Sequence, residues 1–328
     1  MSTPRALRRL RPALKLHPSS YRRHSTAAAA NIADARAYCL NLLRTHDHPS
    51  YILSAFTPPS ARDAHLAIRA FNIDLARIAD AVSNPTVGRM RMQFFRDAIE
   101  HTFAGHPPQE PTALLLAKVL HDGVSARPLT KSFFIKLIAA RETYLSNKPY
   151  PTLDALESYA EATYSSLQYL SLEALGFRSA NLDHVASHVG KAAGIAAVLR
   201  GTPLIAAPPG GVNNTLAAVI LPVDVCAEHG LRQEDVIRHG GAAEGLKDVV
   251  FAVATRASDH LITAREMLKH AGDEGKGGAF TTFLPAVPTS LYLSRLEKVD
   301  FDVFHPSLQR REWRLPWKAY IANYKRQF

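Results

Sequence analysis

Two acidic residues in one predicted helix are the first candidates for chemistry. Asp74 and Asp80 lie six residues apart, with Arg77 three residues from each. Carboxylates of this kind could bind a divalent cation, because Mg²⁺ requires oxygen ligands in octahedral geometry. Six residues place two side chains about 240° apart around an α-helix, so the pair cannot share one ion without a second helix. We therefore favour ordinary ion pairing of Arg77 with both aspartates.

Two histidines offer a second possible metal site. His184 and His188 are four residues apart and would share one face of a helix. The residues between them include no Glu that could act as a base, and no third ligand is evident. We interpret the pair as part of a surface helix, and we predict neither a metal site nor a cofactor.

These residues belong to a chain in which helical periodicity dominates from Asn31 onward. Ser60 is a candidate N-cap, an apolar stripe follows it to Val82, and Asn84-Pro85 is a predicted stop. No paired alternating segments joined by a tight turn occur, which indicates an all-α fold. Further helices are predicted at about 33–45, 87–103, 112–122, 130–145, 152–175, 182–200, 246–271 and 279–297, with two short helices, 222–229 and 233–239, inside an irregular segment 201–245.

The positive charge of the chain is concentrated at its N-terminus. Residues 1–30 hold seven Lys or Arg and no Asp or Glu, so the formal net charge of +10 falls to +3 for the rest. This composition is typical of a mitochondrial transit peptide, and we expect its removal between about Arg23 and Ala30. The nearly neutral remainder argues against a nucleic-acid partner.

Cysteine content and hydropathy exclude two further classes of protein. Cys39 and Cys226 are too few for a disulfide framework or a four-cysteine zinc site, and they fit a reducing compartment. No stretch reaches the roughly 18 consecutive apolar residues of a transmembrane helix. We therefore expect neither a secreted disulfide-bonded protein nor a membrane-spanning one.

The C-terminal tail, residues 301–328, is aromatic and basic. Its candidate membrane-contact residues are Trp313, Arg314, Trp317 and Lys318. Aromatic rings beside basic side chains suit a membrane interface. The alternative is a helix packed on the domain with its charges in water.

Several stretches of the chain resemble the squalene and phytoene synthase family of prenyltransferases. Residues 69–80 and 91–97 resemble the first aspartate-rich helix of the family and the segment that follows it. Residues 190–200 follow its second helix as far as Arg200, and residues 159–176 resemble the helix between the two motifs. The resemblance implies that residues 31–300 form one isoprenoid-synthase-like bundle of roughly ten helices. In that fold Tyr164 would line a central cavity.

The positions of the metal-binding acids of this family are mostly occupied by other residues. Ala76, or its neighbour Arg77, stands at an early acid position of the first motif, and Gly201 and Ile205 stand where the second motif has its aspartates. Only Asp80 remains to bind the Mg²⁺ that would hold a diphosphate. The resemblance thus implies a vestigial anion-binding cavity, formed by Asp74, Arg77, Asp80, Tyr164 and Arg200. Arg200 would pair there with a carboxylate such as Asp80 or bind an anionic headgroup.

One mitochondrial branch of the superfamily, the complex I assembly factor 6 family, shows the same departures. The chain is similar to it at 71–83, in Leu-Arg-Gly-Thr-Pro at 199–203 and in the basic leader. This similarity implies a non-catalytic role in assembling respiratory complex I (NADH:ubiquinone oxidoreductase). The implied partners are complex I subunits or other assembly factors, and the implied location is the matrix side of the inner membrane, peripherally bound.

Two other functions stay open. One is an active Mg-dependent prenyl or lipid transferase with rearranged acids, for which Asp74, Asp80, Asp183 and Asp259 are the candidates. The other is a carrier that keeps the cavity for a lipid or isoprenoid ligand without any chemistry.

Overall fold

The computed structural model describes residues 19–82, 84–122, 129–206, 217–272, 275 and 277–328. Residues 1–18, most of the predicted transit peptide, therefore lie outside the described part. Every regular element in the described part is helical, which confirms the predicted all-α class.

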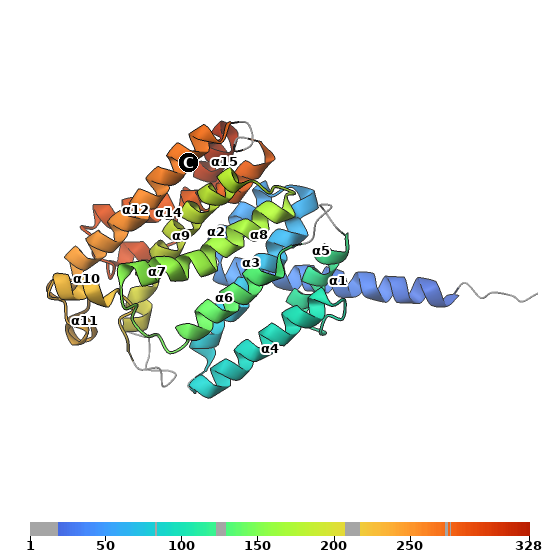
Figure 1. The fold of residues 1–328 in the computed structure, drawn as a ribbon, viewed down its shortest axis with the longest axis horizontal. Coiled ribbons are helices and arrows are strands. Elements are labelled where there is room, and N and C mark those ends of the chain that lie inside the picture. The colour runs from blue at the N-terminus through green and yellow to red at the C-terminus, as the bar shows by residue number, and fades with distance from the viewer. Residues whose placement is uncertain (1–18, 83, 123–128, 207–216, 273–274, 276) are drawn as a thin grey trace, which may run out of the picture.

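The α-helices follow one another along a single bundle (Figure 1). They are α1 (Ser19–His46), α2 (His48–Leu53), α3 (Arg62–Ala81), α4 (Pro85–Phe103), α5 (Pro111–Asp122), α6 (Lys131–Thr143), α7 (Leu153–Ala160), α8 (Ser166–Ala174), α9 (Ala180–Ala206), α10 (Val223–Glu228), α11 (Gln233–His239), α12 (Leu246–His270), α14 (Ala286–Lys298) and α15 (Leu315–Lys325). A π-helical turn, η3 (Glu161–Ser165), joins α7 to α8, and the 3-10 turns are η1 (Ser54–Phe56), η2 (Pro59–Ala61), η5 (Gly240–Ala242), η6 (Gly278–Phe283) and η7 (Pro306–Gln309).

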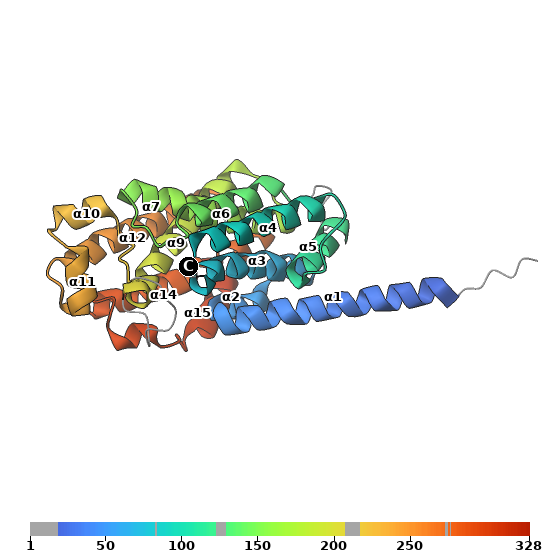
Figure 2. The same ribbon diagram turned by 90° about the horizontal axis from the view of Figure 1, so that it is seen from below.

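Two apolar clusters fill the interior of the bundle. One is formed mainly by buried residues of α1, α3, α5, α6 and α8, and the other mainly by α7, α9, α12, α14 and α15. In Figure 1, α9 lies between α8 and α12, at the centre of the molecule. Figure 2 shows that α1 extends beyond the bundle, while Ala35, Cys39, Leu42 and Leu43 in its C-terminal half are buried.

Two predicted helix starts need correction, and one predicted helix stop is also a start. The first helix begins at Ser19, well before residue 33. Ser60 lies in the turn η2 and does not cap α3, whose N-cap residue is Ala61. Asn84-Pro85 starts a helix as well as ending one, because the Asn84 carboxamide accepts a hydrogen bond from the Thr86 amide at 2.8 Å and a proline is tolerated in the first turn.

Helix interiors also depart from the sequence pattern in two places. α9 continues through Pro203 to Ala206, so the start of the segment expected to be irregular is helical. The helix predicted at 279–297 is divided into η6 and α14. In both places buried side chains such as Thr202 and Phe280 tie the backbone to the core, and this packing outweighs local propensity.

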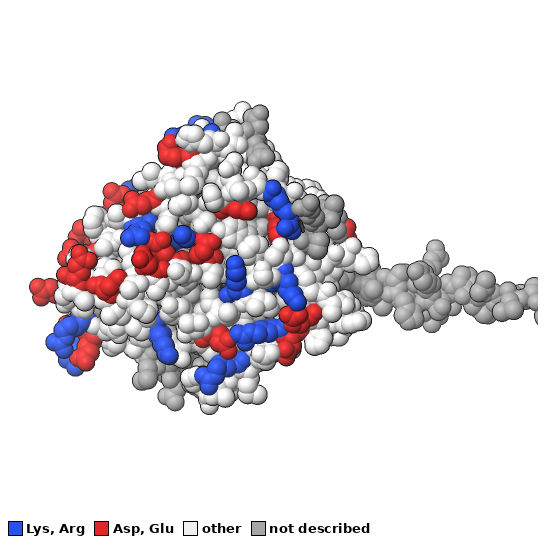
Figure 3. Space-filling model, viewed as in Figure 1, with Lys and Arg blue, Asp and Glu red and all other residues white. Residues whose placement is uncertain are grey.

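α9 is long and apolar enough to cross a membrane by length and composition, but 61% of its most apolar window is buried inside the bundle. That burial is expected of the core helix of a globular fold. The outer surface seen in Figure 3 carries Lys and Arg interspersed with Asp and Glu, and the described part of that face has no extended basic surface.

The tail folds back onto the domain through α15. Leu315, Ala319 and Ala322 are buried and belong to the same apolar cluster as α9 and α12. The opposite side of the tail carries the exposed side chains of Trp313, Trp317, Tyr320 and Tyr324. The two interpretations of the tail are therefore compatible, since one side of it packs and the other presents aromatic rings to solvent.

Candidate functional site

A cavity of about 570 Å³ opens between α3, α9 and α14. The turn of chain from α1 into α2 and the segment that follows η7 close it further. A second cavity of about 190 Å³ shares Ala76, Asp80, Arg141 and Tyr164 with it. The two are therefore branches of one space, which we call the central cavity.

Four of the five predicted cavity residues line this space. Arg77 and Asp80 come from α3, Tyr164 from η3 and Arg200 from α9. Asp74 does not line it, because its Oδ2 accepts a hydrogen bond from the Thr112 hydroxyl of α5 at 3.0 Å. Burial there raises the pKa of Asp74 to about 6. The two aspartates thus face different neighbours, as their six-residue spacing predicts.

The predicted ion pairs of Arg77 are not formed. Among the described residues Arg77 makes no ion pair with Asp74 or Asp80, although its charge opposes the increase in both of their pKa values. Partial burial raises the pKa of Asp80, and Arg141 opposes that shift as well. Longer-range attraction to Arg77 therefore replaces the local ion pairing expected along the helix.

Arg200 does not form the predicted ion pair with Asp80 either. Its guanidinium carbon lies 5.9 Å from the centroid of the Tyr292 ring, in a cation–π arrangement. Both Arg200 and Tyr292 line the central cavity. Two partners were predicted for Arg200, a carboxylate and an anionic headgroup. No carboxylate of the described residues forms an ion pair with Arg200, and the anionic ligand stays a prediction.

The positions of the missing acids do face the cavity. Ala76 lines both of its branches, and Gly201 and Ile205 line the smaller one. The three positions that the resemblance assigns to acids therefore line one space.

The residues present do not fit the Mg²⁺ cluster that the family resemblance implies. Besides Asp80, the carboxylates on the larger branch are Asp47 and Glu312. Asp47 caps α2 by accepting from the Ser50 amide at 3.1 Å, and Glu312 receives two hydrogen bonds from the guanidinium of Arg314, each 2.9 Å long. No group of three or more His, Cys, Asp or Glu suited to a metal occurs among the described residues.

Sequence reasoning missed the polar residues that complete the cavity. They are Arg69, Asn72, Arg141, Gln168, Thr289, Tyr292 and Arg295. Arg141 Nη2 donates to Asn72 Oδ1 at 2.7 Å, and Arg69 Nη2 lies 3.5 Å from Gln168 Oε1. One signal was available: Arg69, Asn72, Ala76 and Asp80 recur every three or four residues and share one face of α3.

The membrane-contact candidates lie together but have unequal exposure. Trp313 and Trp317 are 83% and 68% exposed, and the Trp317 ring stacks on Tyr320 with centroids 5.9 Å apart. Lys318 is exposed as well. The charge of Arg314, in contrast, is already paired with Glu312.

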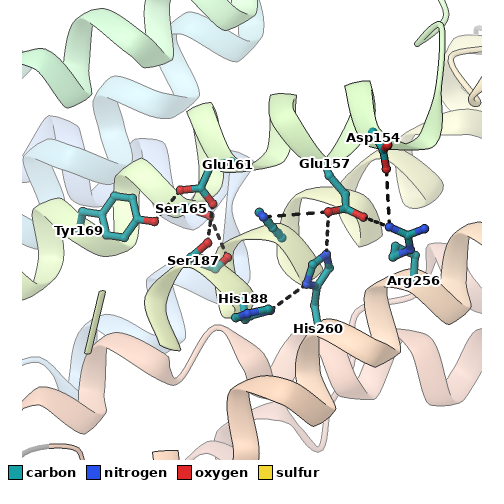
Figure 4. A network of polar contacts seen from close by, with 10 residues as sticks. Asp154, Glu157, Glu161, Ser165, Tyr169, Ser187, His188, Arg256 and His260 are labelled. Atoms are coloured by element: carbon teal, nitrogen blue, oxygen red, sulfur yellow. Dashed lines mark hydrogen bonds and ion pairs between the residues drawn. The ribbon is translucent and has the colours of Figure 1, made fainter. Parts of the chain in front are cut away.

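A second polar network, outside the central cavity, joins α7 to α9 and α12 (Figure 4). The Glu157 carboxylate forms an ion pair with Arg256 and lies 3.3 Å from His260 Nε2. The Nδ1 atoms of His260 and His188 are 2.9 Å apart. With both rings neutral, one Nδ1 donates to the other, and His260 Nε2 has no hydrogen-bond partner in the described part of the chain although Glu157 lies nearby.

This network corrects the interpretation of the histidine pair. His188 is half-buried and contacts His260 across the interface of two helices, whereas His184 is exposed. In the other half of Figure 4, Glu161 accepts hydrogen bonds from Tyr169 Oη and Ser187 Oγ. The contacts cross between helices, so the network ties η3, α7, α8, α9 and α12 together.

Comparison with known sequences identifies relatives over nearly the whole chain. The squalene/phytoene synthase family matches residues 43–320. The rat protein named "NADH dehydrogenase (ubiquinone) complex I, assembly factor 6" is 41% identical over 93% of this chain and 87% of its own length. The human protein of that name is 39% identical over 89% and 82%, and the Drosophila melanogaster homolog is 33% identical over 88% and 84%.

Comparison with solved structures confirms the predicted fold. A dehydrosqualene synthase superposes with a TM-score of 0.71 over 91% of this chain and 98% of its own. A squalene synthase from Alicyclobacillus acidocaldarius superposes with a TM-score of 0.66 over 83% and 97%. Both are 16% identical in sequence, so the likeness extends to the fold alone.

Proposed function

The chain belongs to the squalene/phytoene synthase family and, within it, to the complex I assembly factor 6 group. From this membership we propose that the chain assists the assembly of mitochondrial respiratory complex I without catalysing prenyl transfer. Its partners in this role are complex I subunits or other assembly factors. The relatives that carry the assembly-factor name span most of both chains, which supports the transfer of that role.

One observation carries the non-catalytic part of the proposal. The family cavity is retained, but the positions that face it as Ala76, Gly201 and Ile205 carry no carboxylate. A diphosphate leaving group needs its charge balanced by metal ions held on both sides, and Asp80 alone cannot hold them.

The alternative of a transferase with rearranged acids gains no support from the geometry. Asp74 is hydrogen-bonded by Thr112, Asp259 is exposed on α12, and Asp183 lies near the start of α9 outside the cavity lining. Of the four candidates only Asp80 lines the central cavity. The alternative of a lipid or isoprenoid carrier stays open, because the central cavity that it requires is present.

The finer location and the division of the chain are part of the same proposal. Residues 1–30 act as a leader that directs the chain to the matrix, residues 31–300 form the helical domain, and residues 301–328 form the tail. Because α1 begins at Ser19, cleavage between Arg23 and Ala30 would fall inside that helix. The exposed rings of Trp313 and Trp317 support peripheral attachment to the inner membrane.

The test is the content of respiratory complexes, measured by native gel, in cells that lack this chain. Loss of assembled complex I, with the other complexes kept, is the expected result. The full chain should restore complex I, and the chain without residues 1–30 should not. Normal complex I in the deleted cells would refute the assembly role, and full rescue by the leaderless chain would refute the leader.

A further inference from the structure

The outer side of α4 carries an apolar stripe. Val87, Met90 and Phe94 are 42%, 68% and 49% exposed. Their spacing of three and four residues places them along one side of the helix. The same helix packs on the bundle through other residues, such as the buried Met92 and Ile99. A surface helix normally turns its apolar side inward and its polar side to water, so a second apolar line on the outside indicates a contact with another molecule.

Unpaired positive charge accompanies this stripe. Residues 81–96 contain three arginines and no Asp or Glu. Arg96 forms an ion pair with Glu142 of α6. Arg89 and Arg91 are exposed, and neither forms an ion pair with a residue in the described ranges. The N-terminal half of α4 therefore combines three exposed apolar side chains with two cations that no carboxylate of the described chain neutralises.

This combination complements one kind of partner. A helix whose apolar side is bordered by Asp or Glu can lay that side on the stripe and bring its carboxylates to Arg89 and Arg91. Guanidinium groups favour such contacts, because their planar donors match carboxylate oxygens in pairs. A basic partner would be repelled by the same two arginines, so the charge of this face discriminates between partners.

The position of α4 in the bundle favours a protein over a membrane as the partner. Figure 2 shows α4 and α15 on opposite sides of the bundle, and the two helices are also far apart in the view of Figure 1. The tail that contains α15 presents Trp313 and Trp317, the residues proposed to contact the inner membrane. A bundle that rests on the membrane through the tail keeps the α4 side in the aqueous matrix, where proteins are the available partners.

We propose that the outer side of α4, formed by Val87, Arg89, Met90, Arg91 and Phe94, is a docking surface for an acidic amphipathic helix of another protein. The proposal rests on the assembly role, since that role requires contact with a complex I subunit or another assembly factor. Apolar residues of the partner cover the stripe, and its carboxylates pair with the two arginines. This surface is separate from the membrane-contact residues of the tail.

Site-specific photo-crosslinking in mitochondria tests the surface directly. With p-benzoylphenylalanine in place of Phe94, we expect an adduct with another protein, and mass spectrometry should map it to a segment with Asp or Glu beside apolar residues at helical spacing. The same group in place of Ile262 of α12, which is 54% exposed, should not form this adduct. No adduct, or an adduct with lipid, with a second copy of this chain or with a segment that lacks acids, would overturn the proposal.

Arg91→Glu, introduced into the chain that carries the crosslinker at position 94, tests the charge pairing. The adduct should decrease at least about tenfold, as expected for the loss of one charge-assisted hydrogen bond. Arg62→Glu is the matched control, because Arg62 at the start of α3 is also exposed and has no ion pair among the described residues. Its adduct should equal that of the chain with the crosslinker alone. Equal adducts from the two variants would contradict the pairing.

Complementation links the surface to assembly. In cells that lack this chain, Met90→Glu places a negative charge against an acidic partner and should restore less complex I than Ile262→Glu does at the same protein level. Equal restoration by the two variants would overturn the docking surface. Normal complex I in cells that lack the chain would instead refute the assembly role, and the Phe94 adduct would then decide the surface by itself.

Discussion

Gly190 of α9 lies so close to Ser165 of η3 that a Cβ added to the glycine would come 2.4 Å from the Ser165 Cα. One turn later, a Cβ on Gly194 would lie 2.5 Å from the Ala160 Cβ. Two glycines one turn apart therefore let α9 approach the π-helical turn that brings Tyr164 to the cavity. Their place in the second family motif has a structural reason, which is helix packing.

Gly190→Ala should lower the free energy of unfolding by about 1–3 kcal/mol, because the Ser165 backbone cannot yield to the added methyl group without strain. Chemical denaturation of residues 31–328 measures this change. Gly201→Ala, on the same helix, meets nothing closer than the Ile205 Cδ1 at 4.0 Å and should not destabilise. Equal stability of the two variants would contradict the close approach.

Glu157→Gln should destabilise the fold by about 1–3 kcal/mol, because it removes the charge that holds Arg256 and lies 3.3 Å from His260 Nε2 in a half-buried interface. Thermal or denaturant unfolding gives the value. Glu266→Gln is the control, since the Glu266 ion pair with Lys269 lies on the exposed surface and its loss should have little effect. A Glu157 variant as stable as the control would show that the network does not tie the helices.

Stability should fall as the pH drops from about 6.5 toward 4, in part through His65. Burial, helped by the charge of Arg69, lowers the pKa of His65 to about 4 from its ordinary value of 6.5. Between these two pH values the unfolded chain binds a proton at His65 that the folded chain does not bind. The free energy of unfolding therefore has its full His65 contribution above pH 6.5 and loses it progressively as the pH falls toward 4. His65→Gln should flatten the fall in denaturation midpoint between those pH values. An unchanged slope would refute the assignment to His65.

Vesicle flotation tests the tail. Replacing both Trp313 and Trp317 with Ala should weaken binding to cardiolipin-containing vesicles at least about tenfold, because each ring buries apolar area at the interface. Phe94→Ala is the matched control, an exposed aromatic residue of α4. Substitution is preferable to truncation, since Leu315 and Ala319 belong to the core. If the double variant floats as well as the unaltered chain, the membrane contact is made by another part of the protein.

Prenyl condensation should be absent. With farnesyl or geranylgeranyl diphosphate and either Mg²⁺ or Mn²⁺, we expect no condensed product, because Asp80 is the one acid left at the four principal positions. Product analysis with radiolabelled substrate measures this. Turnover that Asp80→Ala abolishes would overturn the non-catalytic proposal.

Much of the fold follows from the order of residues alone. Apolar residues at helical spacing locate α4, α6, α11 and α12 to within a few residues, because a helix must bury one face. The sequence alone also shows that Ala76, Gly201 and Ile205 stand where the family has carboxylates. The excess of positive charge in residues 1–30 is also evident from the sequence without any structure.

Only the tertiary structure shows which residues the buried faces of the helices contact. Spacing places His188 on one helix face with His184, whereas the contact that His188 makes is with His260, 72 residues away on α12. Arg69, Arg141 and Arg200 lie on three different helices, and nothing in their spacing shows that they line one space. Periodicity specifies which side of a helix faces inward, but the crossing of α3, α6 and α9 determines which charges share a cavity, because that crossing depends on contacts between residues far apart in the chain.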